Sequence, residues 1–409
     1  MKLNSGHTVK ASYIGYLTQA ITINFSSLLF VNFEAQYGIS LSKISLLIAV
    51  SFLTQLLGDA FEAKFSAHLN TRVCVVLAHV CAVVGMTGFA WLPDLLPDPF
   101  VGLMICVIIS AIGGGIIEVL ISPIVEACPT KEKSAAMSLL HSFYCWGLAG
   151  VVILSTLFFH FVGIEHWQIL ACLWAIIPAI GAVAFCFVPI YELPEEDSEN
   201  TPAETEGHRS RFLLRSGIFW CFFIIMFCAG AAEQAMSQWA SAFAESGLGV
   251  SKSLGDLLGP CAFALFMGCT RLFYAKASAK LNLVRFITAS SVLCIVAYLI
   301  TALAPVPLVS LIGCALCGLS VGVMWPGTYS LATVKIPYGG VRMFALLAMA
   351  GDIGCLVGPT AAGWIADLCG NNLKVSFVIS TIFPLLIIIL CRAIYKTSGG
   401  KKKKNTENR

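Results

Sequence analysis

Long apolar stretches, separated by a few polar residues, are the main pattern along this chain. Each stretch is long enough to cross about 30 Å of hydrocarbon at about 1.5 Å of rise per residue. The pattern therefore predicts twelve transmembrane helices, at 11–34, 43–66, 72–93, 100–127, 134–161, 167–190, 216–244, 253–276, 281–304, 307–334, 340–367 and 373–395.

The twelve stretches fall into two sets of six, because one charged segment interrupts the series in the middle. We expect an N-terminal six-helix bundle at 1–190, a cytoplasmic linker at 191–215, a C-terminal six-helix bundle at 216–396 and a basic cytoplasmic tail at 397–409. The sets echo each other: LLHSFYCWG begins at Leu139 and LLAMAGDIG at Leu346, 207 residues later. Repeated six-helix halves are typical of rocker-type secondary transporters, whose substrate site lies between the halves.

Composition supports a membrane protein. Of the 409 residues, 58% are hydrophobic and 11% are charged, whereas soluble domains carry about 25% charged residues. Inside hydrocarbon every backbone polar group needs an internal partner, which helices supply. The apolar runs are continuous rather than alternating, which argues against an outer-membrane barrel. An all-α membrane protein is therefore the expected fold class.

The distribution of Lys and Arg predicts the orientation. With a cytoplasmic N-terminus, 21 of the 25 basic residues lie on the cytoplasmic side, three lie outside, and Arg271 lies near the membrane edge. Cytoplasmic loops of membrane proteins carry such an excess. We expect a multi-pass protein of the cytoplasmic membrane with both termini in the cytoplasm. The short polar N-terminus does not resemble a cleavable signal peptide.

Motifs for enzymatic chemistry are missing from the sequence. Most of the 17 cysteines lie inside apolar runs, where they act as small packing residues. No Zn-ligand spacing, phosphate-binding Gly-Lys-Ser/Thr loop, GxSxG or HExxH is found. We therefore expect no enzyme activity, no catalytic residues, no metal, no cofactor and no nucleic acid partner.

Three acidic residues lie deep inside predicted spans: Glu118, Glu233 and Asp352. A carboxylate in hydrocarbon is costly, so each needs a partner or a function. Glu118 is the best candidate for proton coupling, because desolvation disfavours the charged form and lets a carboxyl group exchange a proton near neutral pH. Ser122 lies one turn further on the same face. A protonated Glu118 with a purely structural hydrogen bond is the alternative, and Asp352 is equally open to a structural or a functional role.

Polar stripes predict a water-filled cavity between the helices. At 100° per residue, Glu233, Gln234, Ser237, Gln238 and Ser241 lie within 140° of one another, and a polar face in lipid must line a cavity. Weaker stripes and cavity-facing aromatic residues occur on other spans. The expected proton-coupling residues are Glu118 and Glu233, and the expected substrate-binding residues are Tyr16, Gln19, Asn24, Ser27, Ser122, His141, Trp146, Gln234, Ser237, Gln238 and Trp325.

Several segments resemble the major facilitator superfamily, and specifically the fucose permease branch of sugar–proton symporters. EVLISPIVEACP resembles the family's fourth helix and puts Glu118 at the family's functional glutamate. RLFYAKASAKLNLVRFI resembles the loop after helix eight. The tenth helix is resembled by WPGTYSL, and the eleventh by GDIGCLVGPTAAGWIADLCGN. The chain departs from the family at Ser27, where the family has an aspartate, and in the loop after helix two, where only Arg72 is retained.

The resemblance implies the major facilitator fold, with twelve helices in two pseudo-symmetric bundles. It also implies a monomer that moves a small polar solute, expected to be a sugar, by proton-coupled alternating access within membrane lipid. Arg72, Arg271 and Asp352 are the expected gating or structural residues. Two alternatives stay open, namely an exporter of amphipathic or drug-like compounds, with an acidic and phenylalanine-lined cavity, and a non-transporting membrane sensor.

Overall fold

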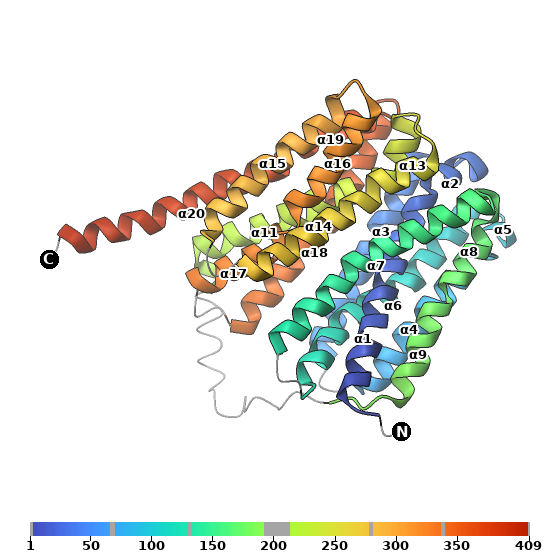
Figure 1. Cartoon of the computed structure of the whole chain (residues 1–409), viewed down its shortest axis with the longest axis horizontal. Helices are drawn as coiled ribbons and strands as arrows, with labels where there is room; N and C mark the ends of the chain where they lie inside the picture. Colours follow the sequence, from blue (N-terminus) through green and yellow to red (C-terminus); the bar gives the residue numbers. More distant parts are fainter. Residues whose placement is uncertain are drawn as a thin grey trace.

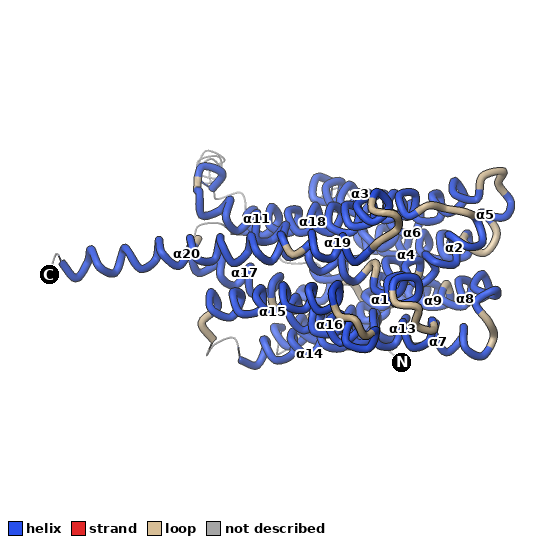
Figure 2. The backbone as a smooth tube through the Cα atoms, turned by 90° about the horizontal axis from the view of Figure 1, so that it is seen from above, coloured by secondary structure: helices blue, strands red, loops and turns tan. Residues whose placement is uncertain are grey.

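The fold is helical throughout the part of the chain that the structure, a computed structural model, describes. That part comprises residues 3–65, 70–129, 133–191, 213–277, 281–336 and 340–407. Its helices run roughly parallel to one another (Figure 2). Twelve of them are long and apolar enough to cross a membrane, so the expectation of a twelve-span, all-α membrane protein is confirmed.

Helices before residue 191 make up one half of the molecule and helices after Leu213 the other (Figure 1). The N-terminal half contains α1 (Ser5–Asn24), η1 (Ser26–Leu29), α2 (Phe30–Tyr37), α3 (Leu41–Phe65), α4 (Thr71–Gly88), α5 (Leu92–Leu95), α6 (Pro99–Ala127), α7 (Lys133–Phe161), η3 (Ile164–His166), α8 (Trp167–Trp174) and α9 (Ile176–Phe187). The C-terminal half contains α11 (Gly217–Ser237), α12 (Ala240–Ala242), η5 (Phe243–Gly247), α13 (Lys252–Asp256), η6 (Leu257–Cys261), α14 (Ala262–Ala277), α15 (Leu283–Leu303), α16 (Pro307–Val321), α17 (Met324–Lys335), α18 (Gly340–Leu368), α19 (Leu373–Ser380) and α20 (Ile382–Glu407).

Polar caps fix several helix starts close to where the sequence places them. The side chains of Asn70, Asp98, Asn282 and Asn372 each accept a hydrogen bond from a backbone N–H in the first turn of the following helix. Such caps satisfy donors that the first turn leaves unpaired. Residues 192–212 of the expected linker lie outside the described residues, and α20 continues through the tail as far as Glu407 (Figure 2).

The sequence echo between the halves is also an echo in structure. Helix α7 begins at 133 and ends at 161, and α18 begins at 340 and ends at 368, so both ends are 207 residues apart. The same offset separates LLHSFYCWG from LLAMAGDIG. We call the end of the bundle that carries both chain termini the terminal side, and the opposite end the far side.

Glycines let α11 and α18 pack with their backbones in contact. A Cβ atom on Gly354 would lie 2.0 Å from the carbonyl oxygen of Phe227, and one on Gly358 would lie 2.4 Å from that of Ala231. A backbone oxygen cannot move aside as a flexible side chain can. The contact therefore requires glycine at these positions.

We expect Gly354→Val to destabilise the C-terminal half by about 1–3 kcal/mol or more, the cost of overpacking a close contact. The thermal stability of the purified protein in detergent measures it. Gly150→Ala is the matched control, because a Cβ there would meet nothing within 4 Å. Equal melting temperatures for the two variants would contradict this account of the α11–α18 contact.

Candidate functional site

Two spans in equivalent positions of the halves break where they meet. The first span breaks after Asn24, at the end of α1, and the seventh after Ser237, at the end of α11. Side-chain bonds to the backbone compete with the helix ladder at such points: Asn24 donates to the carbonyl of Ala20, at 3.0 Å, and Ser27 donates to that of Asn24, at 2.7 Å. Across the interface Gln238 donates to Asn24, with 3.5 Å between Nε2 and Oδ1.

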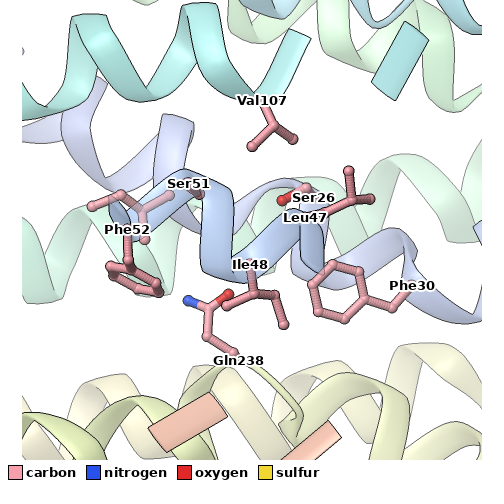
Figure 3. A pocket seen from close by; sticks show the side chains of 9 residues that line it. Ser26, Phe30, Leu47, Ile48, Ser51, Phe52, Val107 and Gln238 are labelled. Carbon is pink, nitrogen blue, oxygen red and sulfur yellow. The ribbon is translucent and has the colours of Figure 1, made fainter. Parts of the chain in front are cut away.

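Beyond this polar contact, aromatic side chains close the interface toward the far side. The rings of Phe30 and Trp239 lie 5.4 Å apart across the halves, and the indole N–H of Trp239 donates to the carbonyl of Pro359, at 2.9 Å. Next to them Gln238 points into a cavity lined by α3 and its neighbours (Figure 3). The cavity measures about 10 Å³, which is about what one water molecule needs. The far side is thus closed to a solute at this point.

A buried charged pair adds a second closure at the far side. Lys252 lies 3.2 Å from Asp256, whose side chain is 1% exposed. Asp256 also accepts hydrogen bonds from Ser241 in its own half and from Thr156 of α7 in the other half, the latter at 3.5 Å. The ammonium group of Lys252 lies 5.6 Å from the ring centre of Phe159, a cation–π contact that also crosses the halves. We call Lys252, Asp256, Ser241 and Thr156 the far gate.

We expect Asp256→Asn to weaken the far gate by about 1–3 kcal/mol, because a buried cation then loses its nearest counter-charge. Lys252 keeps the carboxylate of Glu245, at 3.6 Å, and the Ser241 hydroxyl, at 3.2 Å. Hydrogen–deuterium exchange should become faster in residues 240–261 and 155–161. Asp367→Asn, at the far-side end of α18, controls for an Asp-to-Asn change alone. Unchanged exchange in the Asp256 variant would exclude a gating role.

At mid-depth, Glu118 of α6 lies among polar groups of α1. Gln19 makes a side-chain hydrogen bond to the Glu118 carboxylate, and the other end of its amide, Oε1, has no hydrogen-bond partner. The Tyr16 hydroxyl is 2.9 Å from Ser122 Oγ, one turn along from Glu118. Tyr16 and Gln19 are buried and Glu118 is half-buried.

Glu233 of α11 faces Arg271 of α14. Their closest atoms, Oε2 and Nη2, are 3.6 Å apart, and their side chains are 9% and 23% exposed. Arg271 also interacts with the N-terminal half, through a hydrogen bond to the Cys145 thiol and electrostatically with Tyr16 and Tyr144. Glu118 and Glu233 interact electrostatically with each other. Two acids from opposite halves thus lie close enough to interact, and one of them, Glu233, has an arginine beside it.

A third group of polar side chains lies in the C-terminal half. Tyr329 of α17 makes a side-chain hydrogen bond with Trp325 and interacts electrostatically with Asp352 and Glu118. The break between α16 and α17, just before Trp325, places these residues at the interface. Glu118, Trp325, Tyr329 and Asp352 are all half-buried, whereas Asn24, Gln234, Ser237 and Gln238 are buried.

Exposure is graded across this polar centre. The residues nearer the far side are buried, whereas Glu118, Trp325, Tyr329 and Asp352 are half-buried. The arrangement is a polar centre that is covered on the far side and can hold a hydrogen-bonding solute.

Comparison with known proteins identifies the family. Residues 12–341 match the sequence profile of the Major Facilitator Superfamily. The chain belongs to the major facilitator superfamily. It is therefore a multi-pass secondary transporter that binds a small-molecule solute, and not an enzyme. No curated protein sequence matches it.

Solved structures of major facilitator transporters share the fold at low identity. A bacterial homologue of the human lysosomal transporter Spinster, in an inward-facing and occupied conformation, has a TM-score of 0.76 and 13% identity, with 96% of this chain and 97% of that chain covered. The nucleoside transporter NupG has a TM-score of 0.75 and 12% identity over 96% and 99% of the two chains. The E. coli fucose:proton symporter FucP has a TM-score of 0.62 and 14% identity over 95% and 98%. These likenesses establish the fold but do not single out the fucose permease branch.

Contacts across the halves involve some of the predicted site residues: Asn24 with Gln238, Glu118 with Glu233, and Arg271 with Tyr16. Others neighbour these within one half: Gln19 adjoins Glu118, Ser122 adjoins Tyr16, Ser27 adjoins Asn24, Gln234 adjoins Gln238, and Trp325 and Asp352 adjoin Tyr329. Ser237 is buried. Among the described residues, no group of three or more His, Cys, Asp and Glu side chains is placed to hold a metal ion.

Two predicted residues, Trp146 and Arg72, are not brought to the site. Trp146 is 45% exposed and shares an outward-facing stripe of α7 with Leu139 and Leu157, so it faces lipid. Arg72 donates to the carbonyls of Phe185 and Cys186, at 2.7 and 3.1 Å, and thereby caps α9 within the N-terminal half instead of joining the halves. The side chain of His141 lies outside the described part of the structure.

Several residues of the site were missed from the sequence. Tyr144 and Tyr329 face the acids, and Lys252 and Asp256 form the far gate. The last two are four residues apart in a helix start, a spacing that pairs opposite charges. That signal was readable, but Lys252 was counted only as a topology determinant outside the membrane.

Proposed function

We propose that this major facilitator protein carries a small polar solute of sugar-like size across the cytoplasmic membrane, in symport with protons. The observation that supports this is the electrostatic contact between Glu118 and Glu233, acids of opposite halves, with Arg271 beside Glu233. With both carboxyl groups ionised, the region holds one negative charge that nothing in this trio compensates. A proton on either acid removes that charge at low cost, because uncompensated charge is expensive in a site with little water.

The surroundings of Glu118 suit both of its protonation states. The amide N–H₂ of Gln19 donates to the carboxylate, and its unpartnered Oε1 can accept from the carboxylic acid after the amide rotates. The Tyr16–Ser122 pair lies one turn away. Solute hydroxyls would bond to the buried stripe of Gln234, Ser237 and Gln238.

Alternating access follows from the two breaks. In this state the far side is sealed, and we expect the solute to reach the site from the terminal side, which we assign to the cytoplasm from the excess of Lys and Arg there. Rocking of the halves would separate Phe30 from Trp239 and Thr156 from Asp256. Export of amphipathic compounds receives less support. That function would need phenylalanines that line the cavity, and Phe222 is fully buried in the core of its own half.

Uptake into proteoliposomes tests this function. The purified full chain would be reconstituted and given radiolabelled D-glucose, D-glucuronate, D-glucose 6-phosphate and uridine, with and without an inside-alkaline pH gradient. We expect the gradient to drive at least one polar solute above its equilibrium level. If solutes are taken up downhill but the pH gradient changes the uptake of none of the four, the proposed proton coupling is wrong. If none of the four solutes is taken up at all, the proposed solute class is wrong.

A further inference from the structure

The guanidinium of Arg271 has few strong hydrogen-bond acceptors for a buried arginine. Its closest carboxylate oxygen, Oε2 of Glu233, is 3.6 Å away, whereas a charge-assisted N–H···O bond is typically about 2.7–2.9 Å long. Its other hydrogen bonds go to sulfur, namely the thioether of Met267, 3.7 Å from Nη2, and the thiol of Cys145, and both are weak acceptors. Its Nε–H is buried and has no hydrogen-bond partner. Unsatisfied buried donors are costly, so the guanidinium retains unused capacity for a strong acceptor.

Arg271 also lies where a solute would pass. It is held by the C-terminal half but interacts with Tyr16 and Tyr144 of the N-terminal half. The planar fork of donors on arginine fits the two oxygens of a carboxylate or phosphate. A neutral hydroxyl would satisfy only one donor and would not compensate the positive charge.

We propose that the transported solute carries an anionic group, a carboxylate or a phosphate, which Arg271 binds once Glu233 has taken up a proton. This inference rests on the proposed proton-coupled transport and names the charge class of its substrate. The proton binds to the carboxylate of Glu233, the ion pair with Arg271 is lost, and Nε and the terminal nitrogens donate to two oxygens of the solute. One proton then enters with each negative charge, so transport of a monoanion is electroneutral.

Other titratable groups surround Glu233, and the test must separate them from it. The groups facing it from the packed helices are Glu118 of α6, Tyr144 and Cys145 of α7, Arg271 of α14, and Asp352 and Cys355 of α18. Tyr298 of α15 donates to the neighbouring carbonyl of Ala232. Among these groups, protonation of Glu233 is the step that allows the anion to bind to Arg271.

Binding to the purified full chain gives the first test. Thermal shift titrations at pH 5.5 and 7.5 would compare D-glucose with D-glucuronate and D-glucose 6-phosphate, which keep the ring and add a carboxylate or a phosphate. We expect one acidic probe to bind at least about tenfold more tightly than glucose, the worth of one charge-assisted contact, and more tightly at pH 5.5. Tighter binding of glucose than of both acidic probes, or no thermal shift with either acidic probe, overturns the proposal.

Two variants distinguish a binding role from a structural one. Glu233→Gln should keep acidic-probe binding and lose its pH dependence, because Arg271 is then permanently free. Arg271→Gln should lose at least about tenfold in affinity, and Arg271→Lys, which keeps the charge without the fork, should not fully restore it. Arg285→Gln, an exposed arginine at the start of α15, controls for removal of one positive charge. Persistent pH dependence in Glu233→Gln overturns the proposal.

Transport measurements separate this inference from the proposed function. In proteoliposomes, accumulation of D-glucuronate, a monoanion, should follow an imposed pH gradient and should not respond to a potassium diffusion potential set with valinomycin. Proton-driven accumulation of glucose that responds to that potential would leave the proposed function intact and overturn the anionic substrate. The carboxylate and phosphate probes decide which oxyanion is preferred.

Discussion

Glu118→Gln is expected to leave a transporter that exchanges solute but cannot concentrate it. Glutamine keeps the size and hydrogen-bonding capacity of the side chain, so Gln19 retains a partner and the fold is preserved. It cannot bind or release a proton. We expect Glu118 to pass the transported proton to Glu233, with which it interacts electrostatically. Its loss therefore breaks the link between the proton gradient and solute movement, although the halves can still rock around the bound solute.

The expected loss is large. An imposed gradient of one pH unit stores about 1.4 kcal/mol per proton, enough for about a tenfold accumulation of solute. The variant should forfeit all of it and only equilibrate the solute. Uptake of whichever of D-glucose, D-glucuronate, D-glucose 6-phosphate or uridine the wild-type protein accumulates measures this, and counterflow with the same probe, without a gradient, should continue.

Glu165→Gln serves as the matched control, because Glu165 is exposed in the loop helix η3 on the far side. It should accumulate solute like the wild-type protein. A Glu118→Gln protein that still concentrates solute in response to a pH gradient would move the coupling role away from Glu118. A variant that also fails in counterflow would show a binding or structural role instead.

The sequence predicted the membrane helices well because the physics is local. Each span must be apolar over its whole length, and caps such as Asn70 and Asn372 mark where helices begin. The acids Glu118 and Glu233 were also predictable, since a carboxyl group inside an apolar run stands out. The arginine partner of Glu233 was not: Arg271 lies near one end of its span in sequence, and the length of its side chain brings it to Glu233.

Misplaced residues show what sequence periodicity cannot settle. Trp146 is next to Cys145, which faces Arg271, yet one residue is about 100° of rotation, and this puts the tryptophan on the lipid face. The breaks after Asn24 and Ser237 meet where Gln238 donates to Asn24, and these two residues are 214 positions apart in sequence. A wheel drawn on one helix does not show such a contact.

A side chain at Gly363 is expected to hold the far side open. Gly363 of α18 lies against α3 of the other half: a Cβ atom there would come within 1.8 Å of Ser45 Oγ and 2.4 Å of the Trp239 ring. Helices α3 and α18 pack closely across the interface in this state. Gly363→Val therefore penalises the far-side-closed state, whereas a state in which the halves are parted at this end has room for the side chain.

The cost of such overpacking, about 1–3 kcal/mol or more, shifts a two-state equilibrium by about fivefold to over a hundredfold. We expect uptake to fall by a similar factor, with faster hydrogen–deuterium exchange in residues 41–50 and 359–368. Gly363→Ala combined with Ser45→Gly tests the cause, since it removes the serine side chain of the opposite half. Partial recovery of uptake relative to Gly363→Ala alone would locate the obstruction between the halves. No recovery would assign it to Trp239 within the C-terminal half and would contradict the proposed block to closure.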